Sequence, residues 1–134
     1  MKKRLTIYTD GCSKGNPGPA SIGVLMYTDD DQKPIFRLSN EIGITTNNQA
    51  EYRALISALE YAVEFRATEV EIRSDSELIV KQMKGLYRVK KAELKPLYER
   101  AQKLAGLIEK FSITSIPREQ NREADKLANS ALGR

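Results

Sequence analysis

Residues 46–76, TNNQAEYRALISALEYAVEFRATEVEIRSDS, decide the fold class because they join a helical pattern directly to a strand pattern. From 48 to 66, small and aliphatic side chains recur at three- and four-residue spacing, which predicts an amphipathic helix with Thr46 or Asn47 as its N-cap. From 69 to 74, Val70 and Ile72 alternate with polar residues, which predicts a short strand. A helix followed by a strand is typical of an α/β sheet.

The residues on either side of this stretch supply the remaining elements. Before it, alternating side chains predict strands at 3–9, 20–28 and 34–42, separated by a loop rich in glycine and proline (11–19) and a polar turn (29–33). After it, the patterns predict a helix that is opened by residues 75–77, runs to about 84 and is ended by Gly85. They also predict a helix at 92–110, a strand at 111–116, a loop at 117–120 and a helix at 121–132. The order βββαβααβα predicts one domain, residues 1–134, built on a mixed five-stranded sheet with helices on both faces.

The composition excludes several kinds of active site. The 134 residues include no histidine, no tryptophan and one cysteine, Cys12. Without imidazole there is no Ser-His-Asp triad and no histidine metal site, and a single thiol forms neither a disulfide nor a cysteine-rich zinc site. Any metal bound by the chain is therefore expected to be a hard cation held by oxygen atoms.

Charge is distributed unevenly along the chain. The net charge is +4, yet residues 81–118 alone carry +7 and the remainder −3. This asymmetry favours a polyanion-binding face beside a carboxylate-rich site, although a basic run also occurs on ordinary solvated helices. No stretch approaches the roughly 18 apolar residues of a membrane span. With its unpaired Cys12, we expect a soluble protein of the reducing cytoplasm with no membrane partner.

Four acidic residues lie at the ends of the predicted elements. Asp10 ends the first strand, Glu51 lies in the first turn of the first helix, Asp75 follows the fourth strand, and Asp125 lies in the first turn of the last helix. Side chains at such positions can converge at one edge of an α/β sheet. Clustered carboxylates need a multivalent cation to stay ionised, and a pair of Mg²⁺ ions meets that need while supporting phosphodiester hydrolysis without histidine. The alternative for Glu51 and Asp75 is that they only stabilise helix N-termini.

Four motifs of the chain resemble those of type 1 ribonuclease H. They are TDGCSKGNPGPA (9–20), TNNQAEYRAL (46–55), IRSDS (72–76) and NREADKLA (121–128), in the family's order and over essentially the whole chain. The resemblance implies the ribonuclease H fold and endonucleolytic hydrolysis of the RNA strand of RNA/DNA hybrids. The products have 5′-phosphate and 3′-hydroxyl ends, and the cofactors are two Mg²⁺ ions, for which Mn²⁺ substitutes. Asp10, Glu51, Asp75 and Asp125 are implied as the catalytic, metal-binding set, with Asp10 bridging both ions.

The same resemblance implies positions that contact the substrate. Asn16, Asn47, Asn48 and Gln49 match family positions that face the minor groove, where amides donate to and accept from 2′-hydroxyls and base edges. Thr46 matches a position that holds a phosphate of the DNA strand. Helix capping is the alternative role for Asn47 and Asn48.

The sequence departs from the common family pattern in two places. The loop at 116–121 is short and has no histidine, and we interpret Arg118 as the replacement, able to neutralise phosphate or help release product but not to act as a general base. Between the helices, residues 84–91 show no inserted helix or basic protrusion. In one interpretation, a set of basic residues partly replaces the protrusion in holding the hybrid, and Tyr87 packs against its sugars. In the other interpretation, these residues form a solvated turn between helices. The basic set is Lys84, Arg88, Lys90, Lys91 and Lys95.

Three functions are compatible with these features. We expect an active, monomeric endoribonuclease on RNA/DNA hybrids, with double-stranded RNA as a further candidate substrate. The alternative is a binding module for hybrid or double-stranded RNA with reduced or lost catalysis, because the histidine is missing. A domain of a reverse transcriptase is the third, although Met1 and the finished last helix favour a freestanding protein.

Overall fold

The computed structural model describes residues 3–28 and 33–133, so most of the predicted turn at 29–33 lies outside the described residues. Within these residues, no helix is both long enough and apolar enough to span a bilayer. The elements in chain order are β1 (Arg4–Ser13), β2 (Gly18–Thr28), β3 (Phe36–Thr45), α1 (Asn47–Glu64), β4 (Glu69–Ser74), α2 (Glu77–Met83), α3 (Lys95–Ala105), β5 (Lys110–Ser115), a short 3-10 helix (Arg118–Gln120) and α4 (Arg122–Ala131).

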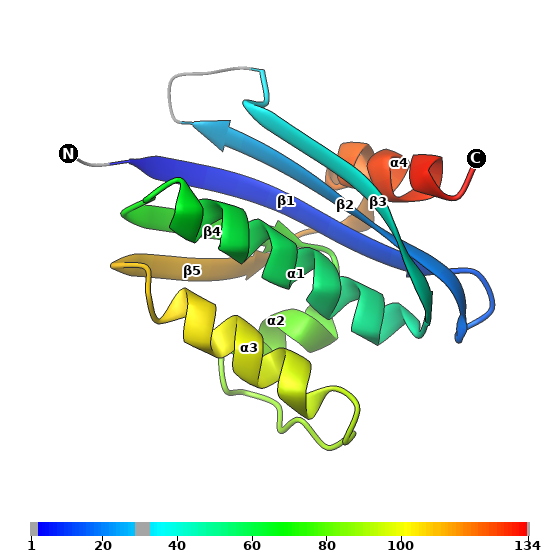
Figure 1. Cartoon of the computed structure of the whole chain (residues 1–134). Coiled ribbons are helices and arrows are strands. Elements are labelled where there is room, and N and C mark those ends of the chain that lie inside the picture. The colour runs from blue at the N-terminus through cyan, green and yellow to red at the C-terminus, as the bar shows by residue number, and fades with distance from the viewer. Residues whose placement is uncertain (1–2, 29–32, 134) are drawn as a thin grey trace.

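The strands of the described chain form one mixed sheet in the order β3-β2-β1-β4-β5 (Figure 1). β1 pairs antiparallel with β2, and β2 with β3, whereas β4 runs parallel to both β1 and β5. Ile7 lies opposite Ile72, and Ile72 opposite Ile113, so apolar side chains of three parallel strands line up on one face. The predicted mixed five-stranded α/β sheet is confirmed.

Helices cover both faces of the sheet, as predicted, and two glycines show how closely they approach it. A Cβ atom on Gly11 of β1 would lie 2.3 Å from the carbonyl carbon of Ala50 in α1, and one on Gly23 of β2 would lie 2.2 Å from the carbonyl oxygen of Ala124 in α4. Gly11 follows Asp10, and Asp10 is paired with Gly23, so the two glycines face opposite sides. α1 therefore covers one side, together with α2 and α3, and α4 covers the other (Figure 1).

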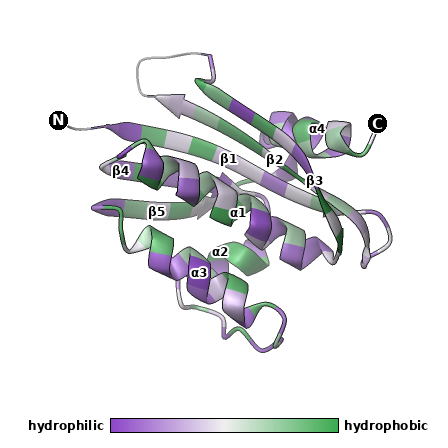
Figure 2. Ribbon diagram, viewed as in Figure 1, coloured by the Kyte–Doolittle hydropathy of each residue, from purple (hydrophilic) through white to green (hydrophobic). Residues whose placement is uncertain are grey.

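The main core lies between the sheet and α1. Leu5, Ile7 and Ile72 from the strands and Leu55 from α1 are at most 1% exposed. Hydrophilic and hydrophobic residues recur along α1 and α3 (Figure 2), so each helix buries one side and leaves the other in water. This burial holds α1, and with it Glu51, against β1.

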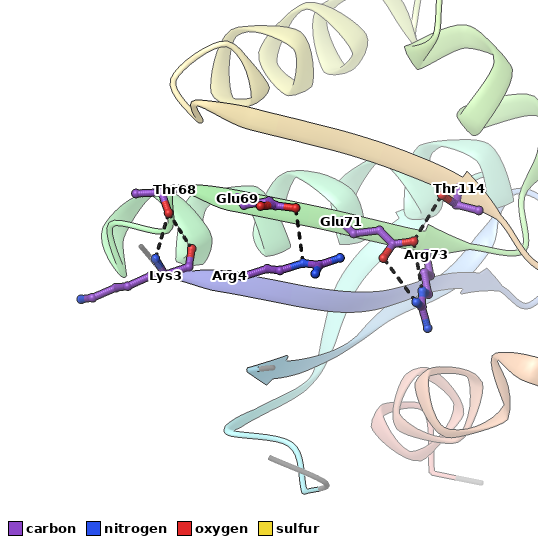
Figure 3. A network of polar contacts seen from close by, with 7 residues as sticks. All are labelled: Lys3, Arg4, Thr68, Glu69, Glu71, Arg73 and Thr114. Atoms are coloured by element: carbon purple, nitrogen blue, oxygen red, sulfur yellow. Dashed lines mark hydrogen bonds and ion pairs between the residues drawn. The ribbon is translucent and has the colours of Figure 1, made fainter. Parts of the chain in front are cut away.

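A network of polar contacts joins β1, β4 and β5 (Figure 3). Arg4 forms an ion pair with Glu69 at 3.4 Å. Glu71 accepts hydrogen bonds from Arg73 at 3.3 Å and from the Thr114 hydroxyl at 3.4 Å. These partly exposed contacts contribute little stability individually, but they give the polar side chains on these strands hydrogen-bonding and ion-pair partners.

Three elements differ from the predictions by three residues or more at one end or both. β1 does not end at Asp10 but continues to Ser13, because residues 11–13 keep pairing with β2, and the predicted loop at 11–19 contracts accordingly. The third strand is Phe36–Thr45 instead of 34–42, because β2 pairs with it as far as Thr45. α3 is shorter than the predicted 92–110, starting at Lys95 and ending at its C-cap Gly106.

Candidate active site

Three carboxylates from three elements meet beside the centre of the sheet. Asp10 lies on β1, Glu51 on α1, and Asp75 directly after β4. One carboxylate oxygen of each lies within 4.8 Å of the other two, and Asp10 is only 5% exposed. The convergence follows from the parallel pairing of β1 with β4, which ends at Thr9 opposite Ser74, so that Asp10 and Asp75 leave the pair side by side.

The structure corrects the predicted place of Glu51. α1 begins at Asn47 with Thr46 as its N-cap, and its first turn contains no acidic residue. Glu51 therefore lies in the second turn, where the helix dipole is weak, and its Oε1 accepts a hydrogen bond of 2.9 Å from the backbone N–H of Gly11. For Asp75, the neighbouring Ser76 is the N-cap of α2. Stabilisation of a helix N-terminus therefore does not account for Glu51, whereas Asp75 lies directly before the N-cap of α2 as well as in the cluster.

The electrostatics of the cluster oppose full ionisation of the metal-free protein. Burial, followed by the charges of Glu51 and Asp75, raises the pKa of Asp10 to about 9. Burial and the charge of Asp75 raise the pKa of Glu51 to about 8, against the smaller lowering effects of the Gly11 hydrogen bond and the Arg118 charge. Charged carboxylates at this spacing repel one another in a water-poor environment.

The donor set of this cluster fits a divalent metal. The group Asp10, Glu51 and Asp75 offers only carboxylate oxygens, the ligands that Mg²⁺ and Mn²⁺ prefer, and contains no imidazole or thiol. A bound cation would reverse the electrostatic penalty, because each carboxylate would gain an attractive partner on ionising. The observed arrangement is consistent with a divalent metal site.

Asp125 lies next to Asp10 but outside this group of three. It occupies the first turn of α4, as predicted. The proximity and the charge of its carboxylate both raise the pKa of Asp10 further. The described residues thus place three of the four predicted acids in one tight cluster and the fourth at its margin.

Sequence reasoning did not assign a role to Asn121, although this residue opens the fourth motif. Asn121 is 1% exposed, and its Nδ2 donates to the carbonyl oxygen of Thr9 at 2.8 Å and to Asp75 Oδ2 at 3.2 Å. Its Oδ1 has no hydrogen-bond partner among the described residues. The side chain therefore ties the start of α4 to β1 and to Asp75, a contact that only the tertiary structure shows.

The residues predicted to contact substrate lie where α1 meets the loop after β1. Thr46 and Gln49 form a reciprocal capping box, in which Thr46 Oγ1 accepts from the Gln49 N–H at 3.2 Å and Gln49 Oε1 accepts from the Thr46 N–H at 3.0 Å. Asn47 bridges to the loop: its Oδ1 accepts from the Ser13 N–H at 2.8 Å, and its N–H donates to Asn16 Oδ1 at 2.9 Å. The side-chain cap is Thr46, so capping as the role of Asn47 was wrong.

Asn48 faces the basic segment between α2 and α3. It lines a groove together with Leu86, Tyr87, Arg88 and Lys91, and the segment continues as irregular chain to the start of α3. Tyr87 is 49% exposed, and the Lys81 ammonium lies 4.9 Å from the centre of its ring. The structure therefore places an exposed aromatic ring and several cations beside one of the predicted substrate positions.

Arg118 lies on the rim of the carboxylate cluster. It begins the 3-10 helix that precedes α4 and lines a pocket with Asp75 and Glu77. Its positive charge partly offsets the rise in the pKa of Glu51.

The sheet order and the convergent carboxylates define the ribonuclease H-like class of α/β proteins. Comparison with known proteins agrees: residues 8–131 match the family model described as reverse transcriptase-like. The chain belongs to the ribonuclease H1 family. It superposes on the crystal structure of RNase H1 from the halophilic archaeon Halobacterium salinarum with a TM-score of 0.92 and 43% identity, covering 96% of this chain and 97% of that one.

Two further relatives are similar to this chain over nearly all of its length. LC11-RNase H1, whose crystal structure is in complex with an RNA/DNA hybrid, matches with a TM-score of 0.88 and 45% identity, covering 95% of each chain. A bifunctional protein of Mycobacterium tuberculosis is 43% identical over 129 residues, 96% of this chain and 35% of its own length. The chain thus spans about a third of the mycobacterial relative, and 64% of the curated Halobacterium ribonuclease HI.

Proposed function

We propose that this chain cleaves the RNA strand of RNA/DNA hybrids endonucleolytically, leaving 5′-phosphate and 3′-hydroxyl ends. The observation that carries the proposal is the cluster of Asp10, Glu51 and Asp75, with oxygens within 4.8 Å of one another. Membership of the ribonuclease H1 family and the hybrid bound by LC11-RNase H1 support the choice of substrate. The groove that Asn48 shares with Arg88, Lys90 and Lys91 adds cations for the polyanion.

Asp10, Glu51, Asp75 and Asp125 would hold two divalent cations, Mg²⁺ or Mn²⁺. When bound, such ions supply a more acidic water and neutralise charge at the phosphate. The chain positions its carboxylates through backbone and amide donors, the Gly11 N–H on Glu51 and the Asn121 amide on Asp75. These contacts hold the acids in place before substrate arrives, which limits the reorganisation needed for catalysis.

Hybrid recognition is assigned to the loop after β1 and the start of α1. Because the Oδ1 atoms of Asn16 and Asn47 already accept backbone hydrogen bonds, their Nδ2 groups remain to donate to 2′-hydroxyls or base edges. Asn48 and Gln49 complete the amide set, and Thr46 is proposed to contact a DNA-strand phosphate. Because Gln49 Oε1 lies in the capping box, its Nε2 is the atom that would face the substrate.

The two departures from the family pattern are proposed to be compensated locally. Arg118, beside Asp75, takes the place of the loop histidine by neutralising phosphate charge and helping product leave. The basic segment between α2 and α3 takes the place of a protrusion, with Tyr87 against sugars. The groove that this segment shares with Asn48 supports the assignment.

The test is a cleavage assay with end-labelled RNA/DNA, RNA/RNA and single-stranded RNA, each with Mg²⁺ or Mn²⁺. We expect cleavage of the RNA strand of the hybrid by wild-type protein and loss of cleavage in Asp10→Asn. Glu64→Gln, an exposed acid on α1, is the matched control and retains activity. Undiminished cleavage by Asp10→Asn refutes the proposal. Tight hybrid binding without turnover under either metal would instead identify a binding module.

A further inference from the structure

Asp125 is held by a second asparagine of α4 that lies one turn further along the helix. Asn129 Nδ2 donates to the carbonyl oxygen of Asp125 at 2.9 Å and to its carboxylate Oδ1 at 3.1 Å. We propose that Asn129 is a positioning residue that fixes the Asp125 carboxylate beside Asp10. The inference rests on the proposed role of Asp125 as a metal ligand.

The amide of Asn129 is itself oriented from the sheet. The Cys12 thiol contacts Asn129 Oδ1 at 3.9 Å and lies 3.2 Å from the Ser21 hydroxyl, which in turn donates to the carbonyl oxygen of Ala128. With Oδ1 turned toward the thiol, Nδ2 is turned toward Asp125. The side chain is thus supported by β1 and β2, and its orientation does not depend on the helix alone.

The Asp10–Asp125 and Cys12–Asn129 contacts have matching spacing on β1 and on α4. Asp10 and Cys12 are two residues apart on β1 and share the face that α4 covers, while Asp125 and Asn129 are four residues apart and share one face of α4. The Asp125 carboxyl lies close enough to Asp10 to raise the pKa of Asp10, and Asn129 contacts Cys12, so α4 meets β1 at two positions that are one helical turn apart on α4. Gly23, paired with Asp10, permits this approach because a Cβ there would lie 2.2 Å from the Ala124 carbonyl oxygen.

The hydrogen bond to Oδ1 opposes a force that would otherwise displace the carboxylate. Asp125 lies beside an acid, Asp10, and in its ionised form it is repelled and free to rotate away about χ1 and χ2. A donor to a carboxylate is a charge-assisted hydrogen bond, stronger than a neutral one. Partners that orient metal-binding carboxylates typically account for 10- to 100-fold in metal affinity or activity.

The test uses Asn129→Ala, with Ser130→Ala, an exposed neighbour on α4, as the matched control. Alanine has the higher helix propensity, so the thermal midpoint is expected to stay the same or rise. We expect kcat on the hybrid to fall roughly 10-fold and Mn²⁺ affinity, measured by calorimetry without substrate, to fall to a similar degree, with KM for the hybrid changed less than about twofold. Asn129→Asp, which keeps the shape but replaces the donor with a charge, is expected to lose more.

Each result decides the inference. If Asn129→Ala has the same kcat and Mn²⁺ affinity as the wild-type protein, the inference is overturned. It is also overturned if the thermal midpoint falls in parallel with the loss of activity, because Asn129 would then be a structural residue only. Asp125→Asn is measured alongside. If Asp125→Asn itself binds Mn²⁺ and cleaves normally, the proposed role of Asp125 fails; if it is defective while Asn129→Ala is normal, only the positioning role fails.

Discussion

In the absence of metal, the stability of the protein is expected to fall as the pH rises from 6 to 8. Burial and mutual repulsion raise the pKa of Asp10 from 3.8 to about 9 and that of Glu51 from 4.5 to about 8. In the unfolded chain both groups keep their ordinary pKa values and are ionised throughout this range. The folded protein therefore binds more protons than the unfolded chain, and the free energy of unfolding decreases with rising pH.

The magnitude follows from the number of protons involved. One additional proton in the folded state changes the free energy of unfolding by about 1.4 kcal/mol per pH unit. If the strongly interacting pair of Asp10 and Glu51 holds only one extra proton, the loss between pH 6 and pH 8 is about 2.7 kcal/mol, and a second retained proton would increase it. The chain contains no histidine, the residue that would otherwise titrate in this range, so the background is small.

The assay is urea unfolding in EDTA at pH 6, 7 and 8. We expect the wild-type slope to disappear in the double variant Asp10→Asn/Glu51→Gln and to persist in the control Glu64→Gln. Added Mg²⁺ is expected to stabilise wild-type protein more at pH 8 than at pH 6, because binding favours ionised carboxylates. A wild-type free energy that is flat or rises with pH in EDTA, or a slope that survives in the double variant, would refute the reasoning.

Three further substitutions test neighbouring features. Arg118→Ala is expected to lower kcat about tenfold and to change KM for the hybrid less than about threefold; equal changes would make Arg118 a plain phosphate contact. Asn121→Asp places a further carboxylate beside Asp75 Oδ2, now 3.2 Å from the amide nitrogen, and urea unfolding in EDTA should show a larger loss of stability at pH 8 than at pH 5; a loss independent of pH would contradict this. Gly23→Ala forces its Cβ against the Ala124 carbonyl oxygen and is expected to cost about 2 kcal/mol in the free energy of unfolding; an unchanged urea midpoint would show that α4 can shift without cost.

Local pattern was sufficient for most of the fold. The strand at 69–74 has the predicted bounds, Thr46 caps α1 as one of the two expected candidates, and Gly85, with a φ of 77°, follows the end of α2 as predicted. The error at β1 has a tertiary cause. Residues 11–13 look like the start of a loop beside Gly15 and Gly18, yet they belong to the hairpin ladder because β2 supplies their partners.

The site was predictable in its carboxylates but not in the amides that hold them. Asp10, Glu51 and Asp75 were selected by their positions in the element order, and parallel pairing of β1 with β4 explains why they meet. Asn121 and Asn129 have no distinguishing pattern, because asparagine near a helix start or on its exposed side is ordinary. The Asn121 contact with Asp75 joins the start of α4 to the end of β4, so it depends on the packing of α4 against the sheet, which Gly23 permits. The Asn129 contact with Asp125 lies within α4 and follows from their four-residue spacing, but the Cys12 thiol that Asn129 Oδ1 contacts comes from β1, which periodicity does not encode.

The chain has no histidine, and repulsion within the carboxylate cluster opposes ionisation of the acids, so the protonation state of the site depends on the few groups around it. Among the described residues, four groups favour ionised carboxylates here. They are the Gly11 N–H on Glu51, the Asn121 amide on Asp75, the Asn129 amide on Asp125, and the charge of Arg118, which is exposed and therefore screened. They leave the pKa values of Asp10 and Glu51 far above their ordinary range, so a metal-free cluster at neutral pH holds protons that a divalent cation would displace. Cation binding, and not a protein base, is then the event that ionises the site, and activity in such a chain should follow metal concentration and pH together.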